Sequence, residues 1–221
     1  MLVAYASSVN IVLPKKATNR VDYAAEYLQK KLLQQGFAVS VTKNGKADKN
    51  SECKVYLSIS KNTASLKKEG FEITTTVKQS KKGAITNISI VGNDGTGCIY
   101  ACNELAEQIK KNGISKLPSS VKDAPEMVLR GGCIGVQKPY LLPGRMVYEY
   151  PYTPELFPWF YDKQHWIEYL DMLVENRMNS VYLWNGHPFA SLVKLPDYPY
   201  AVEVDDATFE KNKEIFAFLT K

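Results

Sequence analysis

Residues 161–187 read YDKQHWIEYLDMLVENRMNSVYLWNGH, and this stretch decides the fold of the second half of the chain. Apolar side chains recur there at helical spacing, which predicts an amphipathic helix: Trp166, Ile167, Leu170, Leu173 and Val174. A short apolar run, 181–184, follows and ends at Asn-Gly, which predicts a buried strand. A helix that leads into a buried strand is half of a parallel β/α unit, and such units carry ligand-binding groups just past the strand. Trp184, Asn185 and His187 occupy that position.

The flanking segments of the second half repeat the same order. Residues 127–136 form a glycine-rich apolar run that predicts a strand buried on both faces, and residues from 205 or 206 to the end predict a helix with an acidic N-cap. The order is strand, helix, strand, helix, with long loops only after strands. Because a closed barrel needs eight such units, we expect the chain to be cut from a longer protein. A small open sheet packed on the first half is the alternative.

The first half predicts a different class of fold. Apolar alternation indicates five strands and two helices, in the order strand, helix, four strands, helix. The expected strands are 10–13, 37–42, 53–59, 69–78 and 86–91, and the expected helices are 18–35 and 98–111. This order predicts an α+β domain with a mostly meandering sheet and helices over one face. The glycine-rich turn 92–97 has neither the P-loop nor the dinucleotide spacing, so we interpret it as a plain tight turn.

Charge and aromatic content divide the chain at the same place. The net charge is +5 overall, but residues 1–125 hold 19 Lys and Arg against 10 Asp and Glu, whereas residues 126–221 hold 9 against 13. The change falls across the segment 118–125, which is bounded by two prolines and predicts a linker. We therefore expect an accessory domain at 1–125 and a second domain at 126–221. The lysines are scattered and lack an aromatic platform, which favours a solvated surface over nucleic-acid binding.

Cysteines and hydropathy exclude several classes of protein. Cys53, Cys98, Cys102 and Cys133 show no metal-ligand spacing, and Cys98 and Cys102 predict small buried side chains rather than a disulfide. We therefore expect no metal and no cofactor. No apolar run is long enough to span a membrane, and the first residues lack the features of a signal peptide. If the natural protein is periplasmic or secreted, as we expect, its leader is absent from this sequence.

Short motifs in the second half resemble the start of a known catalytic barrel. Arg130-Gly131 precedes the glycine-rich strand, and Arg177-Met178-Asn179 precedes the strand that ends in Trp184. This order resembles glycoside hydrolase families 20 and 67, the hexosaminidase-like and α-glucuronidase-like enzymes. The segment 90–94, Ile-Val-Gly-Asn-Asp, and the following helix near Tyr100-Ala101 also resemble the second domain of the hexosaminidases. The resemblance implies an α+β accessory domain followed by a partial (β/α)8 barrel.

The resemblance also implies where the site residues lie. Family 20 places an Asp and a sugar-binding Arg at the end of the first barrel strand, where this chain has Gly135 and Lys138. Lys138 can donate a hydrogen bond but lacks the planar fork of arginine. Both families draw their catalytic acids from later strands, so no catalytic residue is expected before Lys221 and the isolated chain should be inactive. The expected substrate-binding residues are Trp184, Asn185, His187, Lys138, Gln137 and Tyr140.

Three functions remain open from the sequence. The first is the N-terminal part of an exported glycoside hydrolase that acts on a polysaccharide or glycan. The second is a non-catalytic carbohydrate-binding or adhesion module that is complete at this length. A nucleic-acid-associated domain is the weakest of the three. Trp184 can be either a sugar platform or a core residue, and Glu149 and Glu155 read as solvated loop acids. A partial barrel would expose apolar surface, so we also expect self-association.

Overall fold

The computed structural model describes residues 7–62, 66–80, 83–136, 151–184 and 191–220. The chain divides into two compact units, Met1–Val128 and Leu129–Lys221, and each is treated separately below. Among the described residues, no helix has the length and apolar character needed to cross a membrane.

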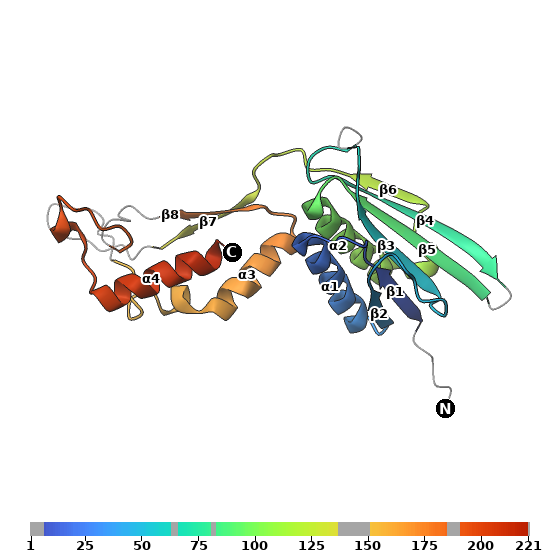
Figure 1. The fold of residues 1–221 in the computed structure, drawn as a ribbon, viewed down its shortest axis with the longest axis horizontal. Coiled ribbons are helices and arrows are strands. Elements are labelled where there is room, and N and C mark those ends of the chain that lie inside the picture. Colours follow the sequence, from blue (N-terminus) through green and yellow to red (C-terminus); the bar gives the residue numbers. More distant parts are fainter. Residues whose placement is uncertain (1–6, 63–65, 81–82, 137–150, 185–190, 221) are drawn as a thin grey trace, which may run out of the picture. The chain divides into compact units, whose positions relative to one another are not determined.

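The first unit is a six-stranded mixed sheet with two helices (Figure 1). Its elements are β1 (Ser8–Val12), α1 (Asn19–Gln34), β2 (Ala38–Thr42), β3 (Cys53–Ile59), β4 (Phe71–Ser80), β5 (Gly83–Gly92), α2 (Gly95–Asn112) and β6 (Ser120–Asp123), with a short 3-10 helix at Ile114–Lys116. The strand order is β2-β1-β3-β5-β4-β6. The expected combination of strands and helices in this unit is confirmed, whereas the expected α+β arrangement of the sheet is not.

The expected meandering sheet is wrong, because most neighbouring strands are parallel. The pairs β1–β2, β1–β3 and β3–β5 run parallel, and only β4 pairs antiparallel, with β5 and with β6. Parallel neighbours need a long crossover. Helix α1 supplies one between β1 and β2, and the segment 43–52 supplies another by returning over β1. The backbone N–H of Asp48 in that segment donates to Oδ1 of the fully buried Asn10 at 2.9 Å.

The segment expected to be a linker contains a strand. β6 pairs with the first half of β4, in a register that places Phe71 opposite Asp123. Its sequence, Ser-Val-Lys-Asp, is polar because β6 is an edge strand with largely exposed side chains. A polar edge strand has no apolar alternation, so the sequence pattern does not distinguish it from a loop.

Helices α1 and α2 pack side by side on one face of the sheet (Figure 1). The core between the layers consists of strand and helix side chains that are at most 3% exposed, including Ile11, Val55, Ile88, Leu28 and Leu105. Tyr27 Oη of α1 donates to Asn103 Oδ1 of α2 at 3.3 Å, within this buried layer. Cys98 and Cys102 are both fully buried free thiols in α2, as the sequence predicts.

The glycine-rich turn before α2 is used for close packing and capping. Oδ1 of Asp94 accepts from the N–H of Gly97 at 2.9 Å, and its Oδ2 accepts from the N–H of Glu69 at 3.0 Å. A Cβ on Gly97 would lie 2.3 Å from the carbonyl oxygen of Gly70, so only glycine lets α2 begin this close to β4. A protein carboxylate thus occupies the first amides of α2, which agrees with the plain-turn interpretation.

The second unit contains a two-stranded parallel sheet and two longer helices (Figure 1). Its elements are β7 (Gly131–Gly135), α3 (Lys163–Glu175), β8 (Ser180–Trp184) and α4 (Asp206–Leu219), with short 3-10 helices at Pro158–Tyr161 and Pro199–Ala201. The helix and strand expected within 161–187 are confirmed. β7 pairs with β8 from Gly131 opposite Ser180 to Gly135 opposite Trp184.

Candidate functional site

The motifs that resemble the barrel enzymes hold the amino ends of β7 and β8 together. Arg130 Nε donates to the carbonyl oxygen of Arg177 at 2.8 Å, and Oδ1 of Asn179 accepts from the backbone N–H of Arg130 at 3.0 Å. Arg177 itself has a positive φ of 56°, which ends α3 and turns the chain into β8. These residues fix the start of both strands, and the candidate site lies at the opposite, carboxyl ends.

One face of the β7–β8 sheet packs on an aromatic core. Ile134 and Leu183 contact a cluster of buried side chains contributed by α3, α4, the segment before α3 and the residue that follows β7. The buried members are Val136, Tyr152, Phe157, Phe160, Trp166 and Ile215. Gly132 also faces this side, since a Cβ there would lie 2.6 Å from Tyr169 Oη of α3. The missing side chain of Gly132 therefore makes room for Tyr169 of α3.

A buried asparagine joins three segments of this core. Nδ2 of Asn212 in α4 donates to the carbonyl oxygens of Tyr152 and Ser191, each at 3.0 Å, and its Oδ1 accepts from Tyr161 Oη. Asn212 and Ser191 are fully buried. Burial, and secondarily the charge of Glu155, raises the pKa of the Tyr161 hydroxyl, so this group stays a donor at neutral pH. The loop before α3 and the loop after β8 are thereby held against α4.

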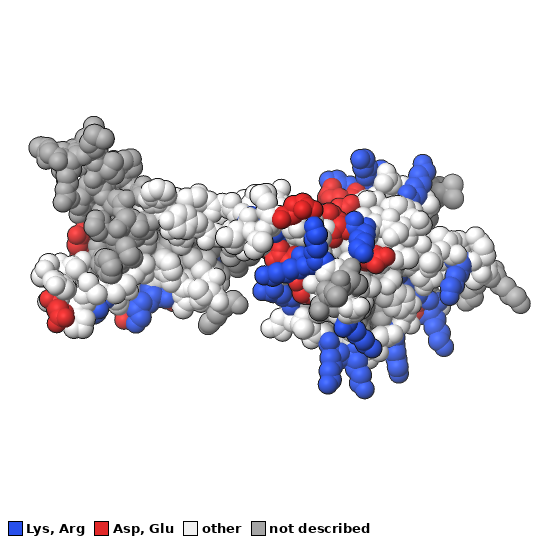
Figure 2. Space-filling model, turned by 90° about the horizontal axis from the view of Figure 1, so that it is seen from above, with Lys and Arg blue, Asp and Glu red and all other residues white. Residues whose placement is uncertain are grey.

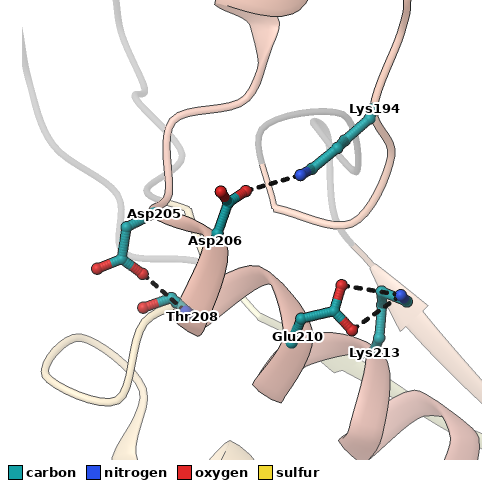
Figure 3. A network of polar contacts seen from close by, with 6 residues as sticks. All are labelled: Lys194, Asp205, Asp206, Thr208, Glu210 and Lys213. Carbon is teal, nitrogen blue, oxygen red and sulfur yellow. Dashed lines mark hydrogen bonds and ion pairs between the residues drawn. The ribbon is translucent and has the colours of Figure 1, made fainter.

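Polar contacts fix the start of α4 on the outside of the unit (Figure 3). Asp205 is the N-cap and accepts from the N–H of Thr208 at 2.7 Å, as the sequence predicts. Lys194 Nζ pairs with Asp206 Oδ1 at 2.7 Å and lies 4.8 Å from the centre of the Phe209 ring. Lys213 pairs with Glu210 one turn further along α4 and lies 5.8 Å from the same ring.

We expect the Asp205 cap to make the stability of this unit depend on pH. Hydrogen bonds from the backbone and side chain of Thr208 lower the pKa of Asp205 below its ordinary value of 3.8. A carboxyl whose pKa is lower in the folded state stabilises that state above its unfolded pKa, and the contribution is lost as the pH falls through the folded pKa. Asp205→Asn keeps a capping oxygen but cannot titrate. We expect its melting temperature to equal that of the parent at pH 7. Below about pH 4 its melting temperature should decrease less than that of the parent. Melting followed by circular dichroism at both pH values checks this, and equal acid losses would contradict it.

The other face of the β7–β8 sheet carries the candidate site. Because strand side chains alternate, Cys133, Tyr182 and Trp184 point away from the aromatic core. Tyr182 is 63% exposed and Trp184 is 53% exposed, with ring centres 6.3 Å apart. We call Cys133, Tyr182 and Trp184 the open face. Trp184 ends β8, so its ring stands at the carboxyl end of the sheet.

The structure describes only one of the six expected substrate-binding residues. Trp184 lies on the open face and is not packed in the core of this unit. Asn185, His187, Lys138, Gln137 and Tyr140 lie outside the described residues, as does Glu149. Glu155 is exposed, as expected for a loop acid. Tyr182 is not among the residues predicted from the sequence, although strand alternation from Trp184 places it on the same face.

Within the described ranges, no group of three or more His, Cys, Asp or Glu side chains is close enough to hold a metal ion. What the open face offers chemically is two exposed aromatic rings beside the small side chains of β7. Such rings bind the apolar side of a ligand and leave polar groups in water.

Comparisons with known proteins relate the chain to carbohydrate-active enzymes. No family model matches the sequence, and no curated protein matches it. A solved structure described as a GH138 enzyme targeting pectin rhamnogalacturonan II is 51% identical, with a TM-score of 0.77 over 96% of this chain. The chitobiase of Flavobacterium johnsoniae, a GH20 enzyme, is 16% identical with a TM-score of 0.53 over 96% of this chain.

The chain spans about a quarter of the length of these two proteins, 23% and 29% respectively. At 16% identity the chitobiase shows a shared fold alone. The expected relationship to families 20 and 67 is therefore not established for either family, whereas the broader expectation holds. The 51% identity to a GH138 enzyme relates this chain to the glycoside hydrolases.

Proposed function

We propose that this chain is part of a glycoside hydrolase that acts on a pectic glycan of the rhamnogalacturonan II type. The observation that carries the proposal is the 51% identity to the GH138 enzyme over 96% of the chain. The chain matches 23% of that enzyme, so we propose that it forms one part of the enzyme and does not carry the whole activity. The non-catalytic binding module is the less favoured alternative, because the relative at 51% identity is an enzyme.

We assign Leu129–Lys221 to the first two β/α units of a (β/α)8 barrel, preceded by the accessory domain. Three features of this unit support the assignment: β7 and β8 are parallel, α3 connects them, and the aromatic core covers one face only. In a closed barrel the helices lie outside and the other face of each strand lines the interior. The open face would then point inward, toward strands contributed by the rest of the enzyme.

The catalytic acids belong to that remaining part of the enzyme in this proposal. Glycoside hydrolysis needs two carboxyl groups that face each other across the scissile bond. The open face supplies Cys133, Tyr182 and Trp184, none of which is a carboxylic acid. The contribution of this chain is therefore substrate binding: Trp184, at the carboxyl end of β8, would pack against a sugar ring at the barrel opening.

The test uses the complete enzyme and a Trp184→Ala substitution. We expect kcat/KM for rhamnogalacturonan II to fall about five-fold, because an aromatic contact is worth about 1 kcal/mol and 1.4 kcal/mol is a factor of ten. The melting temperature of the 221-residue chain should stay at the parent value, since the ring is half exposed in this chain. Tyr200→Ala, which removes an aromatic ring that is 78% exposed outside the sheet, is the control and should leave kcat/KM unchanged.

Two results would count against the proposal. Failure of the complete enzyme to release sugar from any pectic glycan would remove the assigned activity and leave the binding module. An unchanged kcat/KM for Trp184→Ala would remove the sugar-contact role while leaving the hydrolase assignment in place.

A further inference from the structure

The first unit gathers exposed basic side chains at one edge of its sheet. Parallel strands β1, β2 and β3 end at this edge, and the next residues carry Lys15 and Lys16 after β1, Lys46 after β2, and Lys61 after β3. β4 begins there, because Phe71 pairs with Gly92 at the end of β5, and Lys68 precedes β4. We call Lys15, Lys16, Lys46, Lys61 and Lys68 the basic edge.

Backbone hydrogen bonds confirm that these loops lie together. The N–H of Gly45 donates to the carbonyl of Leu13 at 2.8 Å, which joins the loops after β1 and β2. The N–H of Ser60 donates to the carbonyl of Gly92 at 2.8 Å, and the N–H of Asn93 donates to that of Gly70, also at 2.8 Å. These bonds join the loops after β3 and β5 to the start of β4.

The acids at this edge are already engaged. Asp94 caps α2, Glu69 is buried, Asp22 lies 3.8 Å from Lys43, and Glu126 lies 3.2 Å from Lys67. Asp123 ends β6 opposite Phe71, and its Oδ1 accepts from the N–H of Ala124 at 2.8 Å. By contrast, all five lysines of the basic edge are exposed, and none of them forms an ion pair within the described part of the chain. Figure 2 shows Lys and Arg side chains projecting from this unit into solvent.

The position of this charge opposes the local electrostatics of the fold. α1 and α2 both begin at this edge, and a helix N-terminus is the positive end of its dipole. Arg20 in the first turn of α1 adds a further cation, and its Nη1 donates to Thr96 Oγ1 of α2 at 2.9 Å. Lysines at the other ends of the helices, such as Lys110 and Lys111, have a local reason to be there, since they face the negative ends. The helix dipoles do not stabilise the lysines of the basic edge, whereas a bound anionic ligand would stabilise them.

We propose that the basic edge is a docking surface for a carboxylate-rich glycan such as polygalacturonate. The inference rests on the proposed function, because the pectic substrate class supplies the partner, and pectins carry galacturonate carboxylates. A chain of regularly repeated carboxylates complements separated point charges better than it complements one pocket. The surface would hold the polymer, while cleavage belongs to the barrel.

The test compares two variants that lose the same charge. The first, Lys15→Gln/Lys16→Gln/Lys61→Gln/Lys68→Gln, removes four charges from the basic edge. The matched control, Lys30→Gln/Lys110→Gln/Lys111→Gln/Lys116→Gln, removes four exposed lysines from the opposite ends of the helices and the turn after α2. Binding of the 221-residue chain to polygalacturonic acid is measured by isothermal titration calorimetry at about 50 mM salt, where a Debye length exceeds 10 Å.

We expect the basic-edge variant to bind at least about ten-fold more weakly and the control to stay within about two-fold of the parent. Fully methyl-esterified polygalacturonate, which has the same backbone without charge, should not bind. The melting temperature of the basic-edge variant should equal or exceed that of the parent, because cations leave the positive helix ends. This second readout separates lost binding from lost folding.

Three outcomes overturn the inference: no binding by the parent, equal loss in both variants, or tighter binding to a single-stranded DNA oligonucleotide than to polygalacturonate. The last would assign the edge to nucleic acid. Each is distinct from failure of the proposed function, which is measured as hydrolysis by the complete enzyme. A complete enzyme that is inactive on pectin while the chain still binds polygalacturonate would remove the activity alone.

Discussion

Replacing Trp166 by alanine is expected to unfold the second unit while the first remains folded. The ring is 1% exposed, is the largest fully buried side chain, and its Nε1 donates to the carbonyl oxygen of Phe160 at 2.8 Å. It contacts the rings of Trp159, Phe160 and Tyr169. Truncation of a buried tryptophan costs about 3–5 kcal/mol, which is a large share of the stability of a small unit. Hydrogen exchange should show lost protection in α3, β8 and α4 and retained protection in β3 and β5.

Trp184→Ala is the matched control for this prediction. The same chemical change is made at a ring that is 53% exposed and lies on the open face. We expect a change of less than about 0.5 kcal/mol in the free energy of unfolding. Equal destabilisation by the two substitutions would mean that Trp184 is packed in the core and that the open face is wrongly defined.

Gly97→Ala is expected to destabilise the first unit by about 3 kcal/mol, because the added methyl has no space. Its Cβ would lie 2.3 Å from the carbonyl oxygen of Gly70 and 3.3 Å from Cα of Gly92, and both neighbours are backbone atoms. Backbone cannot rotate away as a side chain can, so α2 must move off β4. Urea unfolding followed by far-ultraviolet circular dichroism measures the loss.

The control for Gly97→Ala is a glycine at which an added Cβ would contact no other atom. Gly45 has a φ of +69° and no atom within 4 Å of the position that a Cβ would take, so Gly45→Ala tests backbone strain alone. That conformation costs a non-glycine residue roughly 1–2 kcal/mol. If Gly97→Ala costs no more than Gly45→Ala, the close approach of α2 to β4 does not constrain the sequence.

Local patterns predicted the individual elements well. The helix expected over 18–35 is observed as Asn19–Gln34, and the strand expected over 53–59 is observed as Cys53–Ile59. Both have strong apolar periodicity, which is a property of neighbouring residues and is therefore visible in the sequence. β6 was missed for the opposite reason, since three of its four residues are polar and its pairing with β4 is not local.

Contacts between distant residues set the limits of prediction in the site as well. Asn212 joins Tyr152 and Ser191, which are 60 and 21 residues away, and no pattern in the sequence indicates that its amide is buried. Trp184 could be placed at a strand end, but its exposure depends on which strand face α3 and α4 cover. Alternation would have identified Tyr182 once that face was known.

The open face also provides a chemical handle. Burial raises the pKa of Cys53 to about 12 and that of Cys98 to about 11, and it also raises the pKa of Cys102. Their thiolates are therefore scarce at neutral pH, and the thiolate is the nucleophile. Cys133, the fourth cysteine, is exposed. A maleimide fluorophore would thus label this chain at one position without any engineering, and its emission would report whether the remainder of an enzyme closes over β7.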